Sequence, residues 1–256
     1  MAGLETTPEM FDLRMSEDVR PLFDAVKKFI AEEVDPHTKE FYRLGENREE
    51  RWGYGEGQLE LLDSIKAKAK EQGLWNFFLP DAETGEGLKN LDYAYIATEL
   101  GKNPIASESL NCSAPDTGNM EVLERVGTPE QKEQWLTPLL NGEIRSAYAM
   151  TEPDIPSSDA KNISCRAVLD GDEWVINGQK IWTSTAKFAQ MCFCLVRTEP
   201  DAPKHQGISY LLIPMDTPGI EIRPIMQMTG DADFNEVFFT DVRIPATNIV
   251  GKRGEG

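Results

Sequence analysis

Small hydroxyl side chains gather in this sequence where the spacing of apolar residues changes. The segment AYAMTEPDIPSSDAKN, residues 147–162, starts with alternating apolar residues and then holds two prolines, two adjacent serines and three acids. Tyr148, Met150 and Thr151 lie at the end of an expected strand, where exposed backbone groups and a hydroxyl can contact a polar ligand. The prolines stiffen the loop that follows, which lowers the entropy cost of holding its serines in place. The segment is therefore a candidate binding loop.

A second candidate segment, INGQKIWTSTA at residues 176–186, places Trp182 directly before Thr183 and Ser184. Taken alone, a tryptophan in a strand is more often a core residue than a ligand contact. Glu152 is a candidate general base by residue type, but its position after a strand indicates a surface loop acid. Three other acids are expected to be solvated and two arginines to be ion-paired on the surface: Asp154, Asp159, Glu173, Arg223 and Arg243.

The composition limits the classes of partner. With 256 residues, 40% of them apolar, the chain can form one large domain or two medium ones with a real core. Its net charge of −18 argues against a nucleic-acid or anionic-membrane partner, because no cluster of Lys and Arg could neutralise a phosphate track. No long apolar run and no leader segment is visible, so a cytoplasmic protein without a membrane span is expected.

The four cysteines are expected to be structural. Cys192 and Cys194 stand two residues apart in an apolar segment, so they share one face of an expected strand. A metal site would need further ligands at suitable spacing, and the two histidines, His37 and His205, lie far apart in the sequence. Reduced thiols and no metal site are therefore predicted.

Up to about residue 144 the apolar spacing is helical. A first amphipathic helix is expected to have Ser16 as its N-cap and to stop at Asp35-Pro36. A later helix should end at Gly73, and Thr128 should cap the last one, which runs to Leu140. Four residues between them are expected in the core: Met120, Val122, Leu123 and Val126.

From about residue 145 the apolar period changes to two, which indicates strands. Asp170-Gly171-Asp172 and Asn177-Gly178 are turn signals between alternating runs, so a three-stranded meander is expected there. Residues 198–210 are expected to form a hairpin loop with an exposed His205. The predicted fold class is α+β, with an all-α bundle over residues 1–144, an antiparallel β sandwich or barrel over 145–250, and the start of a linker at 251–256.

The order of motifs resembles that of the flavin-dependent acyl-CoA dehydrogenases. The resemblance to the N-terminal helical domain of that family rests on FIAEEVDP, EQGLWNFFLPD, ATELGKNPIA and GTPEQKEQWLTPLLNGEIRSAYAMTEP. The resemblance to its middle β domain rests on INGQKIWTSTA, LIPMDTPGIEIRP and FNEVFFTDVRIPATNIVG. It covers residues 15–256. Two more segments, NCSAPDTGNMEVL and TEPDIPSSD, resemble a subgroup whose eukaryotic relatives carry a fused kinase-like domain and favour long acyl chains.

The resemblance implies a set of FAD contacts. A flavin ring has a flat apolar face and a polar edge, so Trp182 can supply an aromatic wall and its neighbours the hydroxyls. The family loop runs Thr-Glu-Pro, three residues, then Ser-Asp. This loop has one residue more, so either Ser157 or Ser158 matches the serine that touches the flavin and the acyl-CoA. The implied FAD contacts are Tyr148, Met150, Thr151, Ser157, Ser158, Trp182, Thr183 and Ser184, and the two loop serines are also implied substrate contacts.

The implied reaction is the oxidation of an acyl-CoA to the trans-2-enoyl-CoA in fatty-acid β-oxidation, with electrons passing through FAD to an electron-transferring flavoprotein. Family members remove the acyl α-proton with a carboxylate, usually a Glu of a C-terminal four-helix domain. That domain would begin after Gly256, so no residue is assigned as the base and this chain alone is expected to be inactive. The full-length protein is expected to be a homodimer or homotetramer.

Two other interpretations stay open at this point. An acyl-CoA oxidase, a nitroalkane oxidase or a flavin monooxygenase would share the same ring-binding motifs and would differ in the access of oxygen to reduced flavin. The chain could instead be an inactive ligand-binding fragment. Because the helices that normally cover the β domain would be missing, weak FAD retention and self-association are expected of the isolated chain.

Overall fold

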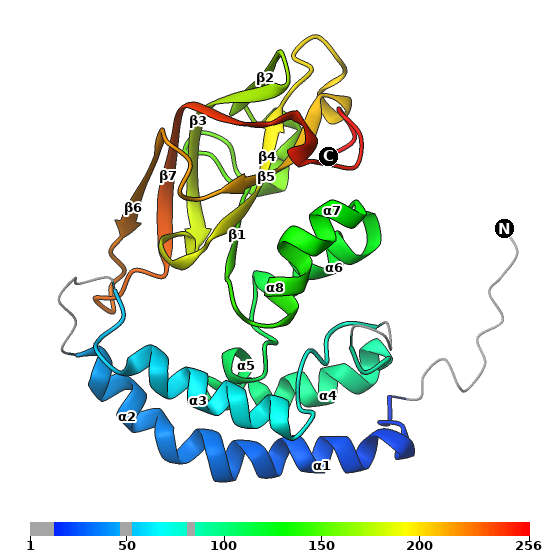
Figure 1. The fold of residues 1–256 in the computed structure, drawn as a ribbon, viewed down its shortest axis with the longest axis vertical. Coiled ribbons are helices and arrows are strands. Elements are labelled where there is room, and N and C mark those ends of the chain that lie inside the picture. Colours follow the sequence, from blue (N-terminus) through cyan, green and yellow to red (C-terminus); the bar gives the residue numbers. More distant parts are fainter. Residues whose placement is uncertain (1–12, 47–52, 81–84) are drawn as a thin grey trace, which may run out of the picture. The chain divides into compact units, whose positions relative to one another are not determined.

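The computed structural model describes residues 13–46, 53–80 and 85–256 (Figure 1). The chain divides into two compact units, Met1–Ser113 and Ala114–Gly256. Residues 1–12, which the predicted helical bundle includes, lie outside the described residues, as does Asp81 at the end of the apolar loop EQGLWNFFLPD.

The described part of the first unit is helical. Its elements are η2 (Glu17–Val19), α1 (Arg20–Phe29), η3 (Ile30–Val34), α2 (Asp35–Gly45), α3 (Gln58–Glu71), α4 (Asn90–Leu100) and α5 (Ala106–Ser109). Apolar residues spaced by three and four put side chains such as Val26, Phe29 and Ile65 into its core. The predicted end of α3 is confirmed, since Gly73 follows it with a φ of +70° that favours glycine.

The predicted helix stop at Asp35-Pro36 is wrong. The chain stays helical from Arg20 to Gly45, and the segment η3 just before the proline is a π-helical turn. A wider turn makes room for a proline ring and tolerates its missing N–H. The second unit repeats the arrangement, where the π-helical η4 (Lys132–Leu136) ends two residues before Pro138. In both places X-Pro follows a widened turn and not a helix end.

The predicted cap at Ser16 is only partly confirmed. Ser16 occupies the N-cap position of η2, but its side chain makes no capping hydrogen bond. Its hydroxyl donates to Asp92 Oδ2 at 2.9 Å, and its backbone N–H donates to Asp92 Oδ1 at 2.8 Å. The serine therefore fastens the start of this helical run to α4, which the local sequence does not reveal.

Three helical segments besides η4 open the second unit: α6 (Asp116–Val126), α7 (Pro129–Gln131) and α8 (Thr137–Leu140). The predicted cap is confirmed, because Thr128 Oγ1 accepts from Gln131 N and the Gln131 side chain accepts from Thr128 N, both at 3.2 Å. Met120 and Leu123 are buried as predicted, and Val122 is half-buried. The prediction that Val126 lies in the core is wrong: it is 54% exposed, because it stands at the very end of α6.

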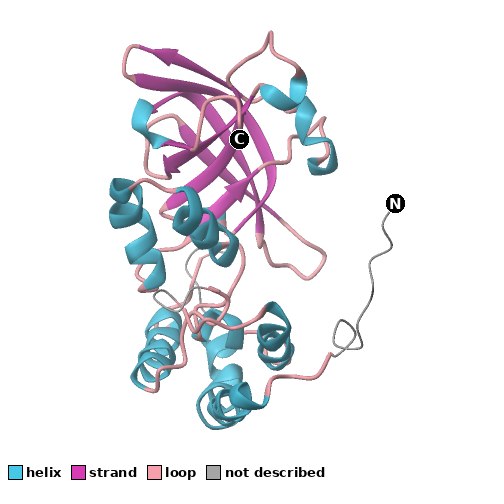
Figure 2. Cartoon of the chain, turned by 90° about the vertical axis from the view of Figure 1, so that its right-hand side faces the viewer, coloured by secondary structure: helices cyan, strands magenta, loops and turns pink. Residues whose placement is uncertain are grey.

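The rest of the second unit is a mostly antiparallel, curved sheet of eight strands (Figure 2). The strands are β1 (Ser146–Ala149), β2 (Arg166–Asp170), β3 (Glu173–Ser184), β4 (Met191–Arg197), β5 (Ile208–Pro214), β6 (Ile220–Ile225), β7 (Phe234–Pro245) and β8 (Ile249–Val250). Their order is β6-β7-β3-β2-β4-β5-β8, and β1 pairs in parallel with β4. Short 3₁₀ turns connect them: η5 (Ser157–Asn162), η6 (Ala186–Phe188), η7 (Lys204–Gln206) and η8 (Ala246–Asn248). A helical region followed by this sheet confirms the predicted fold class.

One of the two predicted turns of the meander is wrong. Asp170-Gly171-Asp172 does turn the chain between β2 and β3, but β3 runs through Asn177-Gly178 with only a register shift against β7. A Cβ on Gly178 would lie 2.7 Å from Cys165 Sγ and 2.8 Å from Cys165 Cα. Glycine is therefore required here for the close approach of the chain before β2, not for a turn.

Several surface and core predictions are confirmed. The loop between β4 and β5 carries an exposed His205. Arg223 pairs with Glu221, and Arg243 with Asp170 and Glu173, at exposed positions. All four cysteines are buried free thiols, and Cys192 and Cys194 belong to the core of the sheet.

Candidate metal-ligand clusters and membrane-spanning helices are both absent from the residues that the structure describes. Among them no group of three or more His, Cys, Asp or Glu side chains could hold a metal ion. In the same part of the chain, no helix has the length and apolarity to cross a bilayer.

The predicted domain boundary at residue 144 stays a prediction. Secondary structure changes from helix to strand between Leu140 and Ser146, whereas the two compact units divide after Ser113. The helices α6 to α8 thus belong to the compact unit of the sheet. The predicted linker start at residues 251–256 lies along β5, with Gly256 N donating to Ile208 O at 2.8 Å and Gly254 N to Ser209 Oγ at 2.9 Å.

Candidate functional site

A hollow of about 610 Å³ opens in the second unit. The start of α6, the exit of β1, the loop after it and the end of β3 line it. Six of the eight residues predicted as FAD contacts lie together on its wall: Tyr148, Met150, Thr151, Ser157, Trp182 and Ser184. The exit of β1 and the end of β3 thus line the same hollow. Two candidate segments that are about 30 residues apart in the sequence therefore form one site.

Trp182 forms the aromatic part of the wall. Its φ of +61° is rare for a residue with a side chain, and the pairing of β3 with β7 shifts register between Lys180 and Thr183. Trp182 is 55% exposed at the resulting bulge, and Phe234 contacts its indole edge-on at a centroid distance of 6.2 Å. Strained backbone at a bulge is a common feature of functional sites.

The two hydroxyl residues after Trp182 point in different directions. Ser184 lines the hollow, whereas Thr183 is 1% exposed and does not line it. The Thr183 hydroxyl oxygen is buried without a hydrogen-bond partner, opposite Asn235, which donates to the Thr183 carbonyl at 3.1 Å. Neighbouring residues of a strand face opposite sides of the sheet, so only one of this pair can reach the hollow.

The loop after β1 brings one of the two candidate serines to the hollow. Ser157 is exposed and lines it, while the side chain of Ser158 lies outside the part that the structure describes. The choice between them therefore stays open. Asp154 in the same loop is exposed, and Asp159 is half-buried and accepts a hydrogen bond from Asn162.

Tyr148 and Tyr210 add a second aromatic surface. Their rings meet at a centroid distance of 5.9 Å, and both line the hollow. Burial raises the pKa of Tyr148 and the pKa of Tyr210, so both phenols stay neutral. Tyr210 lies on β5, 24 residues after the end of the second candidate segment, and no local pattern marks it.

Glu152 is not the surface acid that its place in the sequence suggests. It is only 4% exposed, and its carboxylate lies 2.9 Å from Nζ of Lys180, which is fully buried. The backbone N–H groups of Ser164 and Cys165 donate to it at 2.7 and 2.8 Å, and the Ser164 hydroxyl donates at 2.6 Å. Burial raises the pKa of Glu152, but the Lys180 charge and these hydrogen bonds outweigh burial and lower it overall. A carboxylate so occupied holds structure and does not act as a base.

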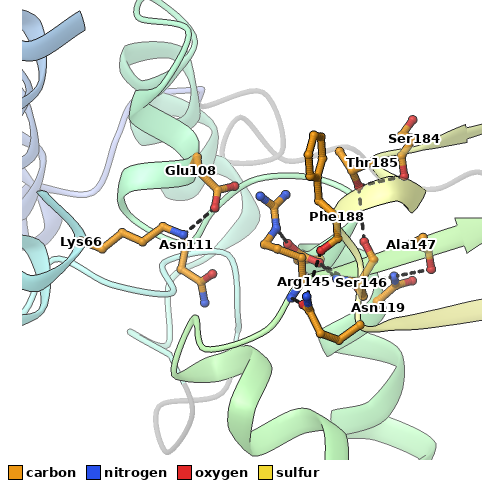
Figure 3. A network of polar contacts seen from close by, with 12 residues as sticks. Lys66, Glu108, Asn111, Asn119, Arg145, Ser146, Ala147, Ser184, Thr185 and Phe188 are labelled. Atoms are coloured by element: carbon orange, nitrogen blue, oxygen red, sulfur yellow. Dashed lines mark hydrogen bonds and ion pairs between the residues drawn. The ribbon is translucent and has the colours of Figure 1, made fainter. Parts of the chain in front are cut away.

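The α6 side of the wall was missed by sequence reasoning. Figure 3 shows the polar network that fastens it, in which Asn119 Nδ2 donates to Ser146 Oγ at 2.8 Å and to Ala147 O at 3.2 Å. Asp116, 3% exposed, accepts from the Ser146 N–H and hydroxyl at 2.6 and 2.5 Å and from Arg145 Nε at 2.5 Å. An Asp and an Asn three residues apart at a helix start share one helical face, which is the signal that could have found them.

Comparisons with known proteins agree with this architecture. The family model "Acyl-CoA dehydrogenase, N-terminal domain" matches residues 16–143, and "Acyl-CoA dehydrogenase, middle domain" matches residues 147–242. The fold and the site thus define a class of protein in which an all-helical segment precedes a β domain, and the β domain carries a hollow lined by aromatic residues. The chain belongs to the acyl-CoA dehydrogenase family.

Three similar proteins illustrate the match. Mouse "Acyl-CoA dehydrogenase family member 10" is 43% identical over 265 residues, covering 99% of this chain and 24% of that protein. "Probable acyl-CoA dehydrogenase FadE2" of Mycobacterium tuberculosis is 48% identical over 202 residues, covering 77% of this chain and 49% of that protein. The solved structure "of a putative acyl-CoA dehydrogenase from Mycobacterium abscessus" has a TM-score of 0.86 and 41% identity, covering 95% of this chain and 62% of that one. The chain therefore spans less than half of the length of these two curated relatives.

The residues of the hollow fit the flavin ring of FAD, which is the cofactor that members of this family generally use. An exposed indole and two neutral tyrosines offer flat apolar surface, and hydroxyls of Thr151, Ser157 and Ser184 stand beside it. This donor set matches a planar ring with a polar edge. Of the described residues that line the hollow, none is Asp or Glu, so no carboxylate would repel the electron-rich reduced ring.

Proposed function

We propose that this chain provides the flavin-ring part of an FAD-dependent acyl-CoA dehydrogenase, which oxidises an acyl-CoA to the trans-2-enoyl-CoA. The observation that supports this best is the meeting of Tyr148, Thr151, Ser157, Trp182 and Ser184 around one hollow, in a chain that belongs to the family. When bound, FAD would supply the hydride-accepting chemistry at the acyl β-carbon and carry the electrons onward.

The chain's own residues would bind and orient the reactants. The Trp182 indole offers a wall for the ring face, and the Thr151 and Ser184 hydroxyls can hydrogen-bond its polar edge. The Ser157 hydroxyl, on a loop stiffened by two prolines, can contact the ring and the thioester. Neutral Tyr148 and Tyr210 exclude water from the apolar side without adding charge, which strengthens polar contacts within the hollow.

The base that removes the acyl α-proton is proposed to lie in a part of the polypeptide beyond these 256 residues. No Asp or Glu is found among the described residues lining the hollow, and the Glu152 carboxylate is held by four hydrogen bonds. Electrons are proposed to leave through an electron-transferring flavoprotein in fatty-acid β-oxidation. Assembly of the whole protein as a homodimer or homotetramer is likewise proposed from family membership.

Two experiments test the proposal. FAD is titrated into the chain and into Trp182→Ala while flavin fluorescence is followed, and the variant is expected to bind more weakly. The full-length product is then assayed with acyl-CoAs of graded length and either an artificial electron acceptor or dioxygen. Flavin reduction by acyl-CoA with slow oxygen consumption supports a dehydrogenase. Dioxygen reduction as fast as that of the artificial acceptor would instead show an oxidase, and flavin that no acyl-CoA reduces would overturn the proposal.

A further inference from the structure

A buried ion pair lies behind the wall of the hollow. Lys180 on β3 is 0% exposed, and its Nζ donates to Glu152 Oε1 at 2.9 Å and to the Met150 carbonyl at 3.0 Å. We propose that the pair of Lys180 and Glu152, named the clip here, is a positioning element. It joins the exit of β1 to the end of β3, and thereby holds the Trp182 indole in its exposed, strained position.

Glu152 extends the clip to a third segment. Its Oε2 accepts from the Ser164 N–H and hydroxyl, and its Oε1 accepts from the Cys165 N–H as well as from Lys180. Ser164 and Cys165 directly precede β2. One carboxylate therefore connects the exit of β1, the entry to β2 and the bulged strand β3. It also joins the two ends of the loop that contains Ser157.

The bulge at Trp182 is fixed on both sides. On the Lys180 side, Ile181 N donates to the Thr151 carbonyl at 2.9 Å. On the far side, Asn235 Nδ2 donates to the Thr183 carbonyl at 3.1 Å. A tryptophan at a φ of +61° persists only where its surroundings impose that conformation. If the Lys180 side loosens, the residue can relax to extended backbone, and a shift of one residue in a strand turns a side chain to the opposite face.

Energetics agree with a positioning role. A buried ion pair repays its desolvation only when further hydrogen bonds satisfy both groups, and well-packed apolar residues are often as stabilising. Here both Glu152 oxygens and the Lys180 amine are engaged. The pair adds what apolar residues could not supply, which is a set of directed bonds to the Met150 carbonyl and to the backbone entering β2.

The proposal is tested by amide hydrogen exchange in the chain itself, without cofactor. Lys180→Met keeps the length of the side chain and removes both of its bonds, while Glu152 keeps the three donors of Ser164 and Cys165. The exchange rate of the Ile181 amide is compared with that of core amides in the β4–β5 ladder, such as Phe193 and Leu212. We expect the ratio of the Ile181 rate to the core rates to rise by about tenfold, as in local opening.

Two further variants make the result decisive. Lys66→Met breaks another largely buried ion pair, in which Lys66 Nζ lies 2.6 Å from Glu108. Neither residue lines the hollow, so this variant should leave the ratio of the Ile181 exchange rate to the core rates unchanged. If Lys180→Met does not fold, Lys180→Met with Glu152→Gln removes the uncompensated carboxylate and is measured in the same way. An unchanged ratio, or equal acceleration of all amides, would show that the clip adds only overall stability and would overturn the proposal.

Flavin binding is measured separately, since its link to the clip rests on the proposed function. FAD affinity is expected to fall by about tenfold in Lys180→Met and to stay within about twofold in Lys66→Met. If the Ile181 ratio rises but FAD binds the parent chain and the Lys180 variant equally, the clip is upheld and its flavin role is overturned. If FAD does not bind the parent chain, the proposed function fails for this chain while the exchange result still decides the clip.

Discussion

Replacing Asp116 by alanine is expected to loosen α6 from β1. The carboxylate, 3% exposed, accepts from the Ser146 N–H and hydroxyl and from Arg145 Nε, all at 2.5 to 2.6 Å. Its removal leaves a buried N–H and part of a guanidinium without their acceptor. Breaking a buried pair by removing one partner costs about 3–5 kcal/mol. Because the Arg145 side chain is 18% exposed and can regain some water, we expect the low end, about 3 kcal/mol.

The free energy of unfolding from urea titrations measures this loss, followed by circular dichroism at two wavelengths that report helix and sheet. Asp170→Ala is the matched control, because Asp170 pairs with Arg243 at an exposed position and its loss should leave the midpoint unchanged. Asp116→Asn keeps the shape of the side chain and should fall between the two. A loss below about 1 kcal/mol in Asp116→Ala would refute the reasoning, since the network would then contribute no more than one ordinary hydrogen bond.

Three other predictions concern the sheet and the hollow. Gly178→Ala should destabilise the chain by about 1–3 kcal/mol, because the added Cβ would lie 2.7 Å from Cys165 Sγ. In the control Gly171→Ala the added Cβ has no atom within 4 Å and meets only backbone strain. Thermal unfolding of both variants measures the difference in stability. Trp182→Ala should weaken FAD binding by about tenfold without lowering the unfolding midpoint, because the indole is exposed and stacking is lost; equal affinity would contradict its place as the wall. Because folding lowers the pKa of Glu152, the ionised carboxylate stabilises the folded chain fully above the ordinary glutamate pKa. This stabilisation is lost as the pH falls through the pKa that Glu152 has in the folded chain. Unfolding midpoints measured against pH should therefore fall less steeply in acid for Glu152→Gln than for the parent chain.

Local signals in the sequence were sufficient where one residue and its neighbours decide the structure. Gly73 ends α3 because glycine takes positive φ readily, and Thr128 caps α7 because its hydroxyl reaches the N–H three residues on. The change of apolar period near residue 145 likewise predicted the change from helices to strands. The same reasoning failed at Pro36 and at Gly178, where a π-helical turn and a close approach of the chain before β2 override the usual meaning of proline and Asn-Gly.

The candidate site shows the same division. Residue types and family resemblance named both segments of the hollow, and six of their eight predicted residues line it. They could not show that Thr183 faces the buried side, because the bulge at Trp182 sets the alternation of β3 and depends on pairing with β7. Nor could they reveal Tyr210 or the α6 wall, which reach the hollow only through the folding of distant segments.

The sequence by itself thus determined the order of elements, the family and the residue types that can hold a flat ring. Only the tertiary structure decided the role of Glu152, whose place after a strand suggested a solvated acid. Folding brings Lys180, 28 residues away, to within 2.9 Å of its carboxylate and removes both groups from water. A charge can be buried only where such partners meet it, and which partners meet depends on strand pairing and not on neighbours in the sequence.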